Sequence, residues 1–245
     1  MSQDRVAVVI PSRYASTRFP AKPLALLCGK IMVQHVYEKA VASKADVVLV
    51  ATDHPAIFDA VNKFGGRAVM TAESHPSGTD RIAEAVSKID EEIDIVVNVQ
   101  GDEPLIPTSV IDELIAIMKG NPAIEMATVA VPGVRSKMTE NNVKVVFSED
   151  SFALYFSRSM IPFLRSGGVE APVYLHWGIY AYRKSTLDRF VALPPGKLEE
   201  CEKLEQLRAL ENGIKIYVHL SELESIGIDT PEDLIRAEKK LLKGK

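Results

Sequence analysis

Three cationic side chains follow the first hydrophobic segment of the sequence. Residues 6–10 run into the polar stretch "PSRYASTRFPAK", which contains Arg13, Arg18 and Lys22. Guanidinium groups bind phosphate oxygens in a bidentate manner and an ammonium acts as a point charge, so this set suits a polyphosphate. The stretch lacks the glycines of a Walker loop or a dinucleotide fingerprint. On spacing alone, an ordinary solvated loop is an equal alternative.

Two aspartates are candidates for holding a magnesium ion. Asp102, in "NVQGDEP", directly follows a hydrophobic segment, where a carboxylate loses solvation energy unless it is paired or binds a metal. Mg²⁺ is usually held by one or two carboxylates together with substrate phosphates, and Asp229 in "GIDTPEDL" is the second candidate. From the residues alone, a helix N-cap is the preferred interpretation of Asp229, because Asp or Thr before Pro-Glu-Asp caps a helix well.

Further polar side chains fall at a helix start and along a later strand. Ser77 and Arg81 introduce a helix, where they could cap it and lie on the surface, or recognise a nucleotide. In "LHWGIYAY", strand alternation places His176 and Tyr180 on one face, which could line a pocket. A core histidine is the plainer interpretation of His176 taken alone.

Three other residues have ordinary interpretations when each is taken alone. Arg158, in "YFSR", fits a surface arginine at a strand end. Glu205 and Gln206, in "EKLEQLR", are expected in a helix, where adjacent polar residues usually form a solvated face. Their spacing by itself predicts no site.

Strands and helices alternate through the first half of the chain. Hydrophobic runs predict strands over 6–10, 47–51, 67–70 and 95–99; helical spacing predicts helices from Met32, over 55–64, along Ile82–Ile89 and over 108–119. This alternation indicates crossover connections and a parallel sheet in three layers. Ligands bind outside the carboxyl ends of the strands in such sheets, and polar clusters follow all four predicted strands.

The pattern changes after about residue 124. "EMATVAV", "NVKVVF", "FALYFS" and "LHWGIYAYR" predict strands with little helix between them. They indicate an antiparallel extension over about 125–182, suited to substrate enclosure or dimerisation. The chain closes with a predicted helix "CEKLEQLRALENG", a strand "IKIYVHL" and a helix "PEDLIRAEKKLL". Because no repeat or linker is evident, we expect a single domain over 1–245.

Composition excludes several classes of protein. A net charge of −4 over 245 residues gives too little basic excess to favour nucleic acid binding. The longest apolar runs are strand-length, far below the roughly 20 residues that span a bilayer, and no signal peptide is evident, so we expect a cytoplasmic protein that is not in a membrane. Cys28 and Cys201 form no disulfide framework, and the five histidines lack zinc-ligand spacing.

Motifs spread over residues 6 to about 240 resemble the 3-deoxy-D-manno-octulosonate (Kdo) cytidylyltransferases, the CMP-Kdo synthetases of Gram-negative bacteria. The segments are "IPSRYASTRFPAKPL", "VATDH", "SGTDRIAEAV", "VNVQGDEP", "ALYFSRSMIP", "LHWGIYAYR", "KLEQLRALENG" and "GIDTPEDL". The resemblance implies an α/β, three-layer, Rossmann-like nucleotidyltransferase fold with a mainly parallel sheet. It also implies transfer of CMP from CTP to the anomeric hydroxyl of Kdo, release of pyrophosphate, use of Mg²⁺, a role in lipopolysaccharide biosynthesis and a homodimer.

The resemblance also assigns site residues. The triphosphate-binding loop is matched by Arg13, Arg18 and Lys22, and the metal-binding aspartates by Asp102 and Asp229. Four of these, Arg18, Lys22, Asp102 and Asp229, are expected to be catalytic, and capping becomes the lesser interpretation of Asp229. The Kdo pocket is matched by Gln100, Arg158, His176, Tyr180, Glu205 and Gln206. Positions near the nucleotide are matched by Asp53, Ser77 and Arg81.

Two departures from the family pattern stand out. Ala21 occupies a position before the loop lysine that is usually glycine, and alanine is penalised there if the backbone needs a positive φ. Ile31 stands where proline is common, which concerns only a helix start. Alternative functions are the same reaction on 8-amino-3,8-dideoxy-manno-octulosonate, a sialic-acid-like sugar as acceptor, or a catalytically silent protein that senses CTP.

Overall fold

The chain divides into two compact units in a computed structural model that describes residues 4–15, 19–223, 227–228 and 230–243. Unit 1 comprises Met1–Ile115 and Ser225–Lys245, and unit 2 comprises Ala116–Glu224. The expectation of a single domain over 1–245 stays a prediction, because two compact units in one chain need not fold independently of each other.

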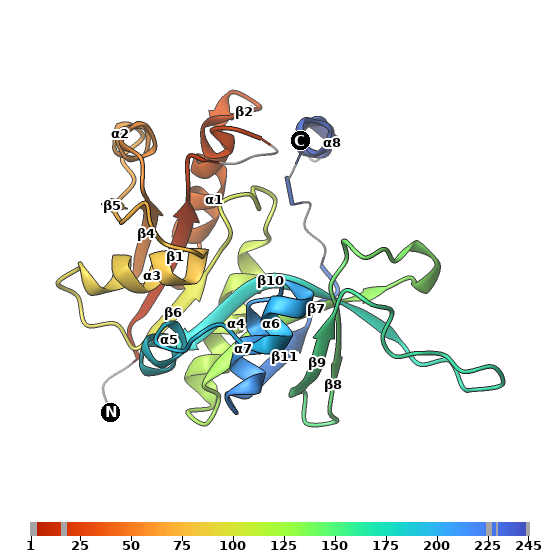
Figure 1. The fold of residues 1–245 in the computed structure, drawn as a ribbon. Helices are drawn as coiled ribbons and strands as arrows, with labels where there is room; N and C mark the ends of the chain where they lie inside the picture. Colours follow the sequence, from red (N-terminus) through yellow and green to blue (C-terminus); the bar gives the residue numbers. More distant parts are fainter. Residues whose placement is uncertain (1–3, 16–18, 224–226, 229, 244–245) are drawn as a thin grey trace. The chain divides into compact units, whose positions relative to one another are not determined.

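Unit 1 is built on four parallel strands. They are β1 (Val6–Ser12), β4 (Val47–Thr52), β5 (Ala68–Met70) and β6 (Ile95–Asn98). The central strand β1 pairs in parallel with both β4 and β6, and β4 pairs with β5, which confirms the four predicted strands (Figure 1). Val6–Ile10 is completely buried, as expected for a strand that is covered on both faces.

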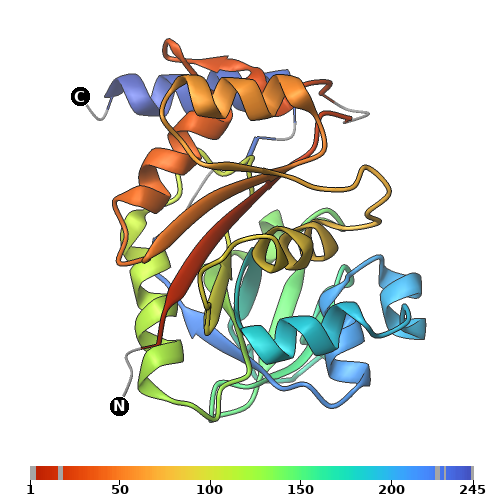
Figure 2. The same cartoon turned by 90° about the vertical axis from the view of Figure 1, so that its left-hand side faces the viewer.

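Helices cover both faces of this sheet. They are α1 (Met32–Val41), α2 (Pro55–Lys63), α3 (Gly78–Ser87) and α4 (Thr108–Gly120), the last of which runs into unit 2. The apolar face of α1, including Met32, Val33 and Val36, is fully buried. Both α1 and α3 pack on β1 and β4, from opposite sides of the sheet (Figure 2). The predicted third helical stripe extends to Ile89, but α3 ends at Ser87.

A small hydrophobic cluster fixes the C-terminal helix α8 (Pro231–Lys243) within unit 1. The two short strands β2 (Leu26–Leu27) and β3 (Lys30–Ile31) form an antiparallel pair that sequence analysis did not predict. The fully buried members of the cluster are Leu27, Met32, Ile228 and Ala237. Burial of Ile228 anchors the chain immediately before α8.

Unit 2 holds the predicted antiparallel strands. They are β7 (Met126–Gly133), β8 (Lys144–Phe147), β9 (Ala153–Ser157) and β10 (Val173–Arg183). Strand β10 is antiparallel to β7 and β8, and β8 is antiparallel to β9. The last strand, β11 (Ile216–Leu220), instead pairs in parallel with β7. The antiparallel extension predicted over about 125–182 from successive strand-like segments with little helix between them is therefore confirmed.

The prediction of one helix over 201–213 is wrong. Two short helices, α6 (Lys197–Glu202) and α7 (Gln206–Glu211), occupy this region. Lys203 ends α6 in the left-handed conformation, with φ 54°, a geometry that terminates a helix. Arg208 then binds Glu199 through two hydrogen bonds of 2.6 and 2.8 Å and fixes the corner. Helix α5 (Lys184–Val191), which directly follows β10, was not predicted.

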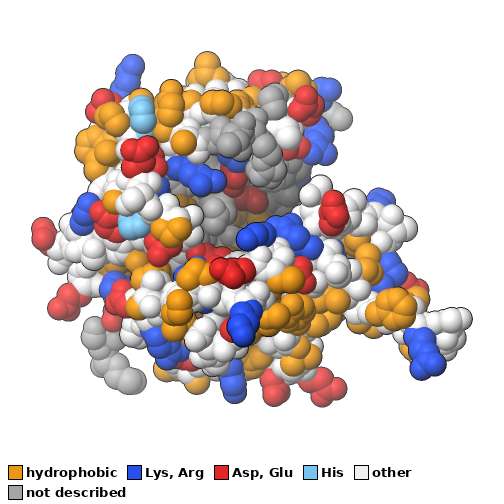
Figure 3. Space-filling model, in the orientation of Figure 1, with side chains coloured by type: hydrophobic (Ala, Val, Ile, Leu, Met, Phe, Trp, Pro, Cys, Tyr) orange, Lys and Arg blue, Asp and Glu red, His pale blue; other side chains and the backbone are white. Residues whose placement is uncertain are grey.

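The surface carries mixed charge. On the face shown in Figure 3, Lys and Arg side chains are interspersed with Asp and Glu, in keeping with the small net charge. No helix among the described residues is both long enough and apolar enough to cross a membrane.

Candidate active site

A pocket of about 330 Å³ opens beyond the carboxyl ends of β1 and β6 in unit 1. The strands of unit 1 lie in the order β6-β1-β4-β5. From β1 the chain adds β4 and then β5 on one side, and after the crossover through α3 it adds β6 on the other side of β1. The order in which strands are added to the sheet therefore reverses between β1 and β6. Such a switch point is where ligands bind in open α/β sheets. The described lining is Pro11, Ser12, Arg13, Lys22, Pro23, His75, Pro76, Ser77, Gly78, Arg81, Gln100, Gly101 and Asp102.

Lys22 and Asp102 form an ion pair in this pocket. The Lys22 Nζ lies 2.6 Å from Asp102 Oδ2, and the side chains are only 14% and 32% exposed. The same ammonium donates a 2.9 Å hydrogen bond to the carbonyl of Ile228, whose own N–H donates to the Asp102 carbonyl at 2.9 Å. These bonds fix the chain that immediately precedes residue 229 against Asp102.

The N-cap of α8 is Thr230. Its Oγ1 accepts a hydrogen bond from the N–H of Asp233 at 3.2 Å, and the Asp233 carboxylate accepts from the N–H of Thr230 at 3.0 Å. This reciprocal pair of hydrogen bonds satisfies the backbone N–H groups of Thr230 and Asp233 at the start of the helix. Thr230 therefore caps helix α8 among the described residues, and the interpretation of Asp229 stays a prediction. Asp229 itself lies outside the described residues, as does Arg18.

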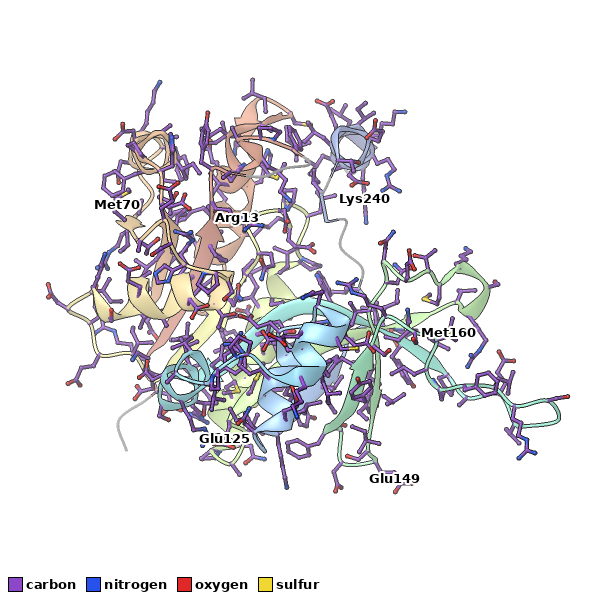
Figure 4. All side chains as sticks on the ribbon, in the orientation of Figure 1. Arg13, Met70, Glu125, Glu149, Met160 and Lys240 are labelled. Atoms are coloured by element: carbon purple, nitrogen blue, oxygen red, sulfur yellow. The ribbon has the colours of Figure 1, made fainter. Side chains whose placement is uncertain are left out.

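Ala21, which stands where the family usually has glycine, adopts a positive φ immediately before Lys22. Ala21 has φ 53° and ψ 27°, the left-handed region in which a Cβ is unfavourable. A short 3₁₀ turn, Lys22–Leu24, follows, and the Ala21 N–H donates to the Tyr14 carbonyl at 3.2 Å. The loop thus keeps a glycine-like path with alanine in it, while Arg13 lies exposed beyond the end of β1 (Figure 4).

Arg81 is held by a buried ion pair with Asp53. Its Nη2 lies 2.7 Å from Asp53 Oδ2, and both side chains are less than a tenth exposed. Its Nη1 also donates to Thr71 Oγ1 at 2.6 Å. The surface interpretation of Arg81 is therefore wrong, although its side chain still lines the pocket. Asp53 is not part of the described lining; its second oxygen accepts from the N–H of Tyr14 at 3.3 Å.

Ser77 and Gln100 also line the pocket. Ser77 caps α3, because its Oγ accepts from the N–H groups of Thr79 and Asp80. Gln100 donates from Nε2 to Asn98 Oδ1 at 3.2 Å. Unit 1 thus brings together, in one pocket, the described residues predicted for phosphate and metal binding, together with Gln100.

His75 lines the same pocket, and sequence analysis did not select it. Its Nε2 contacts the Glu84 carboxylate, which also accepts from the N–H of Ala72 at 2.9 Å and pairs with Lys88. Burial raises the pKa of Glu84, but hydrogen bonds from Lys88, Ala72 and His75 outweigh it and lower the pKa to about 2. A permanent anion therefore orients the imidazole. The histidine in "SHPSGTD" carried no spacing signal that would have identified this pair.

Unit 2 brings His176, Tyr180 and Glu205 close together. The His176 and Tyr180 rings lie 5.4 Å apart, despite a bulge in β10 between Trp177 and Tyr180. Burial raises the pKa of Tyr180 well above 10, with smaller contributions from Tyr182 and Glu205, so its phenol stays protonated. The predicted common face is confirmed for this pair of rings.

His176 is a neutral imidazole at physiological pH. Burial lowers its pKa to about 3. Its Nε2 lies 3.0 Å from Thr128 Oγ1, and that hydroxyl donates to the carbonyl of Ile179 at 2.8 Å. When the Thr128 hydroxyl donates to the Ile179 carbonyl, His176 Nε2 donates to Thr128 Oγ1, and Nδ1 is left as an acceptor.

Arg158 and Gln206 belong to the same unit but have different surroundings. Arg158 donates from Nε to the carbonyl of Glu202 at 2.8 Å, and its own N–H donates to the Glu202 carboxylate at 2.9 Å. Gln206 begins α7 and is 6% exposed, with no hydrogen-bond partner for its Nε2 among the described residues. A buried amide without a partner is a group that a ligand could satisfy.

Comparison with known proteins identifies the family. The family model described as Cytidylyltransferase matches residues 7–216. The chain belongs to the cytidylyltransferase family. A 3-deoxy-manno-octulosonate cytidylyltransferase of Thermodesulfovibrio yellowstonii is 53% identical over 94% of this chain and 96% of the relative. An 8-amino-3,8-dideoxy-manno-octulosonate cytidylyltransferase of Shewanella sp. (strain ANA-3) is 47% identical over 96% and 98%.

A solved structure agrees over the whole cytidylyltransferase chain. It is described as CMP:2-keto-3-deoxy-manno-octonic acid synthetase complexed with CTP, with a TM-score of 0.94, 40% identity, and coverage of 99% of this chain and 100% of that one. The resemblance drawn from the sequence motifs is confirmed. So is the α/β nucleotidyltransferase fold, with its parallel sheet and antiparallel part.

The described donors of this cytidylyltransferase fit a hard divalent cation such as Mg²⁺. The Asp102 carboxylate is partly buried and offers hard oxygen ligands, one of which pairs with the Lys22 ammonium. The described residues contain no cluster of three or more His, Cys, Asp and Glu side chains suited to a metal. Mg²⁺ characteristically needs only one or two carboxylates, because substrate phosphates complete its coordination.

Proposed function

We propose that this cytidylyltransferase transfers CMP from CTP to the anomeric hydroxyl of Kdo, giving CMP-Kdo and pyrophosphate. The observation that carries the proposal is the Lys22–Asp102 ion pair in a pocket at the β1/β6 switch point, where a cation of a type suited to phosphate adjoins a carboxylate of a type suited to a metal ion. Relatives named for this activity at about half identity support the choice of sugar.

The triphosphate is bound by the loop after β1. Lys22 and Arg13 line the pocket, and Arg18 follows Arg13 in the same loop sequence. Phosphoryl-type transfer needs mainly positioning and neutralisation of charge. These cations hold the β- and γ-phosphates and offset the charge that develops on the departing pyrophosphate.

Asp102 and Asp229 hold Mg²⁺ in this proposal. Bound there, the ion supplies Lewis-acid polarisation at the α-phosphate and lowers the pKa of the sugar hydroxyl. The bonds among Lys22, Asp102 and Ile228 support the assignment, since they hold the chain before Asp229 beside Asp102.

Within unit 2, the sugar acid is bound by one polar group of side chains. That group comprises Arg158, His176, Tyr180, Glu205 and Gln206. Arg158 supplies positive charge for the carboxylate. His176 is neutral, so it contributes an acceptor at Nδ1 rather than charge. Tyr180 keeps its proton and contributes a donor.

The reaction is an in-line attack of the anomeric oxygen on the α-phosphorus, with pyrophosphate as the leaving group. The proton of the hydroxyl passes to solvent water as the new bond between the anomeric oxygen and the α-phosphorus forms and the bond from the α-phosphorus to the pyrophosphate oxygen breaks. No side chain in the pocket is assigned as a dedicated general base, because polarisation of the hydroxyl lowers the need for one.

We also propose a cytoplasmic homodimer that acts in lipopolysaccharide biosynthesis. The segment between β9 and β10, which includes Met160, extends away from the strands of unit 2 (Figures 1 and 4). Phe163 and Val169 on it are 84% and 94% exposed, and a second protomer that covered them would bury this apolar surface. Static light scattering of wild type and Phe163→Glu tests this, with loss of the dimer expected for the variant.

Competing sugar acids test the substrate. Pyrophosphate release is measured with CTP, Mg²⁺ and either Kdo, 8-amino-3,8-dideoxy-manno-octulosonate or a sialic acid. We expect the highest kcat/KM with Kdo. A preference for the amino sugar would instead support the activity named for the Shewanella relative. Normal binding of CTP without pyrophosphate release from any sugar would support the silent sensor.

A further inference from the structure

Ser12 carries a buried hydroxyl that no described residue satisfies. The residue is the last of β1 and only 2% of its surface is exposed. Its Oγ has no hydrogen-bond partner among the described residues. A hydroxyl kept from water without a partner is unfavourable, and such groups in proteins usually serve a ligand, a water or a reaction. Ser12 was not among the residues that the sequence motifs assigned.

The hydroxyl borders the nucleotide pocket. Ser12 belongs to the pocket lining, next to Arg13 and across from Gln100–Asp102. A Cβ on Gly101 would lie 2.8 Å from Ser12 Oγ and 2.9 Å from the Pro11 carbonyl. Glycine therefore lets the turn after β6 approach Ser12 closely, and the hydroxyl is held between two segments that both carry ligand-binding candidates.

The neighbouring polar groups are already engaged with protein partners. Ser77 Oγ accepts the N–H groups at the start of α3, and Gln100 Nε2 donates to Asn98. The Lys22 ammonium pairs with Asp102 and with the Ile228 carbonyl. These groups have roles without a ligand, whereas Ser12 Oγ has no partner among the described residues and faces a pocket that a ligand can enter.

We propose that the Ser12 hydroxyl makes a direct hydrogen bond to the bound nucleotide and contributes to CTP affinity. This inference rests on the proposed function, because the pocket must be the CTP site. The proposal predicts different effects on two measured quantities, the affinity for CTP and the stability of the ligand-free protein. Removal of the hydroxyl should weaken the complex with CTP, yet leave the ligand-free protein as stable as before or more stable, since no protein hydrogen bond is lost.

The test measures the Kd of CTP with Mg²⁺ by calorimetry, and the thermal unfolding of the ligand-free protein, for wild type and Ser12→Ala. We expect the variant to bind CTP about 3- to 10-fold more weakly, with an unchanged or higher Tm. The matched control is Ser221→Ala. Ser221 is also buried, at 5% exposure, but its Oγ accepts from the Leu223 N–H at 3.1 Å. This control should lower Tm and leave the Kd unchanged.

Three results would overturn the inference. Equal CTP affinity in wild type and Ser12→Ala would mean that the hydroxyl does not meet the nucleotide, for example because a water satisfies it. A parallel loss of affinity and Tm would mean a structural role. If the wild type itself binds no CTP, the proposed function fails and this inference fails with it, a result that differs from the other two.

Discussion

The ammonium of Lys22 lies 2.6 Å from the carboxylate of Asp102, and the two side chains come from loops 80 residues apart in sequence. In the proposed reaction, Lys22 binds phosphate and Asp102 binds a metal ion. The two groups therefore neutralise one another before the substrate arrives and exchange this partnership for phosphate and metal when it binds. Each of the two partly buried charges is compensated by the other.

Lys22→Met should reduce kcat/KM for CTP by about 10- to 100-fold, because a charge-assisted hydrogen bond to phosphate is lost. Steady-state pyrophosphate release at varied CTP measures this. Lys22→Arg keeps the positive charge and should recover part of the loss. Lys30→Met is the control: its Nζ pairs with Glu38 on the surface, at 47% exposure, so activity should not change. Wild-type kinetics in Lys22→Met would contradict the assignment.

Ala21→Gly should stabilise the protein. Ala21 sits at φ 53°, where a Cβ costs about 1–2 kcal/mol, while glycine loses more backbone entropy on folding by about 0.5–1 kcal/mol. The net gain expected in the free energy of unfolding is therefore about 0.5–1 kcal/mol, measured by urea denaturation. The same change at Ala45, which does not have positive φ, should lower stability. A loss of stability in Ala21→Gly would show that the left-handed conformation is not adopted.

Gly101→Ala should disturb the pocket. The added Cβ would meet Ser12 Oγ at 2.8 Å and the Pro11 carbonyl at 2.9 Å, and the latter is backbone that cannot rotate away. We expect destabilisation of about 1–3 kcal/mol together with weaker CTP binding. Gly120→Ala is the matched control, since a Cβ there meets nothing within 4 Å. If both variants bound CTP equally well, the close approach of the two loops would be disproved.

His176 should make stability depend on pH in mildly acidic solution. Burial lowers its pKa from 6.5 to about 3 in the folded state, so the unfolded state binds the proton more readily. The contribution to stability is complete above pH 6.5 and declines as the pH falls towards 3, by up to about 1.4 kcal/mol per pH unit. The substitution His176→Gln removes this pH-dependent contribution to the free energy of unfolding. The free energy of unfolding of wild type minus that of the variant should fall between pH 6.5 and 3; a constant difference would refute the low pKa.

Local sequence patterns predicted most of the fold. Val6–Ile10 and the Met32–Val41 helix follow from β-branched runs and helical spacing, because each of these elements buries one clear set of apolar side chains. The break at Lys203 did not follow, since a lysine in the left-handed conformation carries no glycine signal. It is stabilised by the Glu199–Arg208 pair across the corner, which is a tertiary contact.

The residue types in the sequence predicted candidate site residues, but they did not predict which side chains form ion pairs with one another. The cations and Asp102 were recognisable because they follow strands. The Asp53–Arg81 ion pair and the His75–Glu84 contact each join segments that only folding brings together. Ser12 was overlooked for a related reason: its hydroxyl is buried without a described partner, and the burial of one polar side chain at the end of a strand is not visible in the sequence.

The central claim is CMP transfer that depends on Asp102, and the most direct test is pyrophosphate release from CTP and Kdo with Mg²⁺ by wild type and Asp102→Asn. Asparagine keeps the size of the side chain but removes the charge that would hold the metal in the proposed reaction. We expect robust, Kdo-dependent release by the wild type and a loss of kcat of at least about 100-fold in the variant, comparable to removing one strong electrostatic group from an active site. Turnover of Asp102→Asn near the wild-type rate, with the variant folded, would contradict the account.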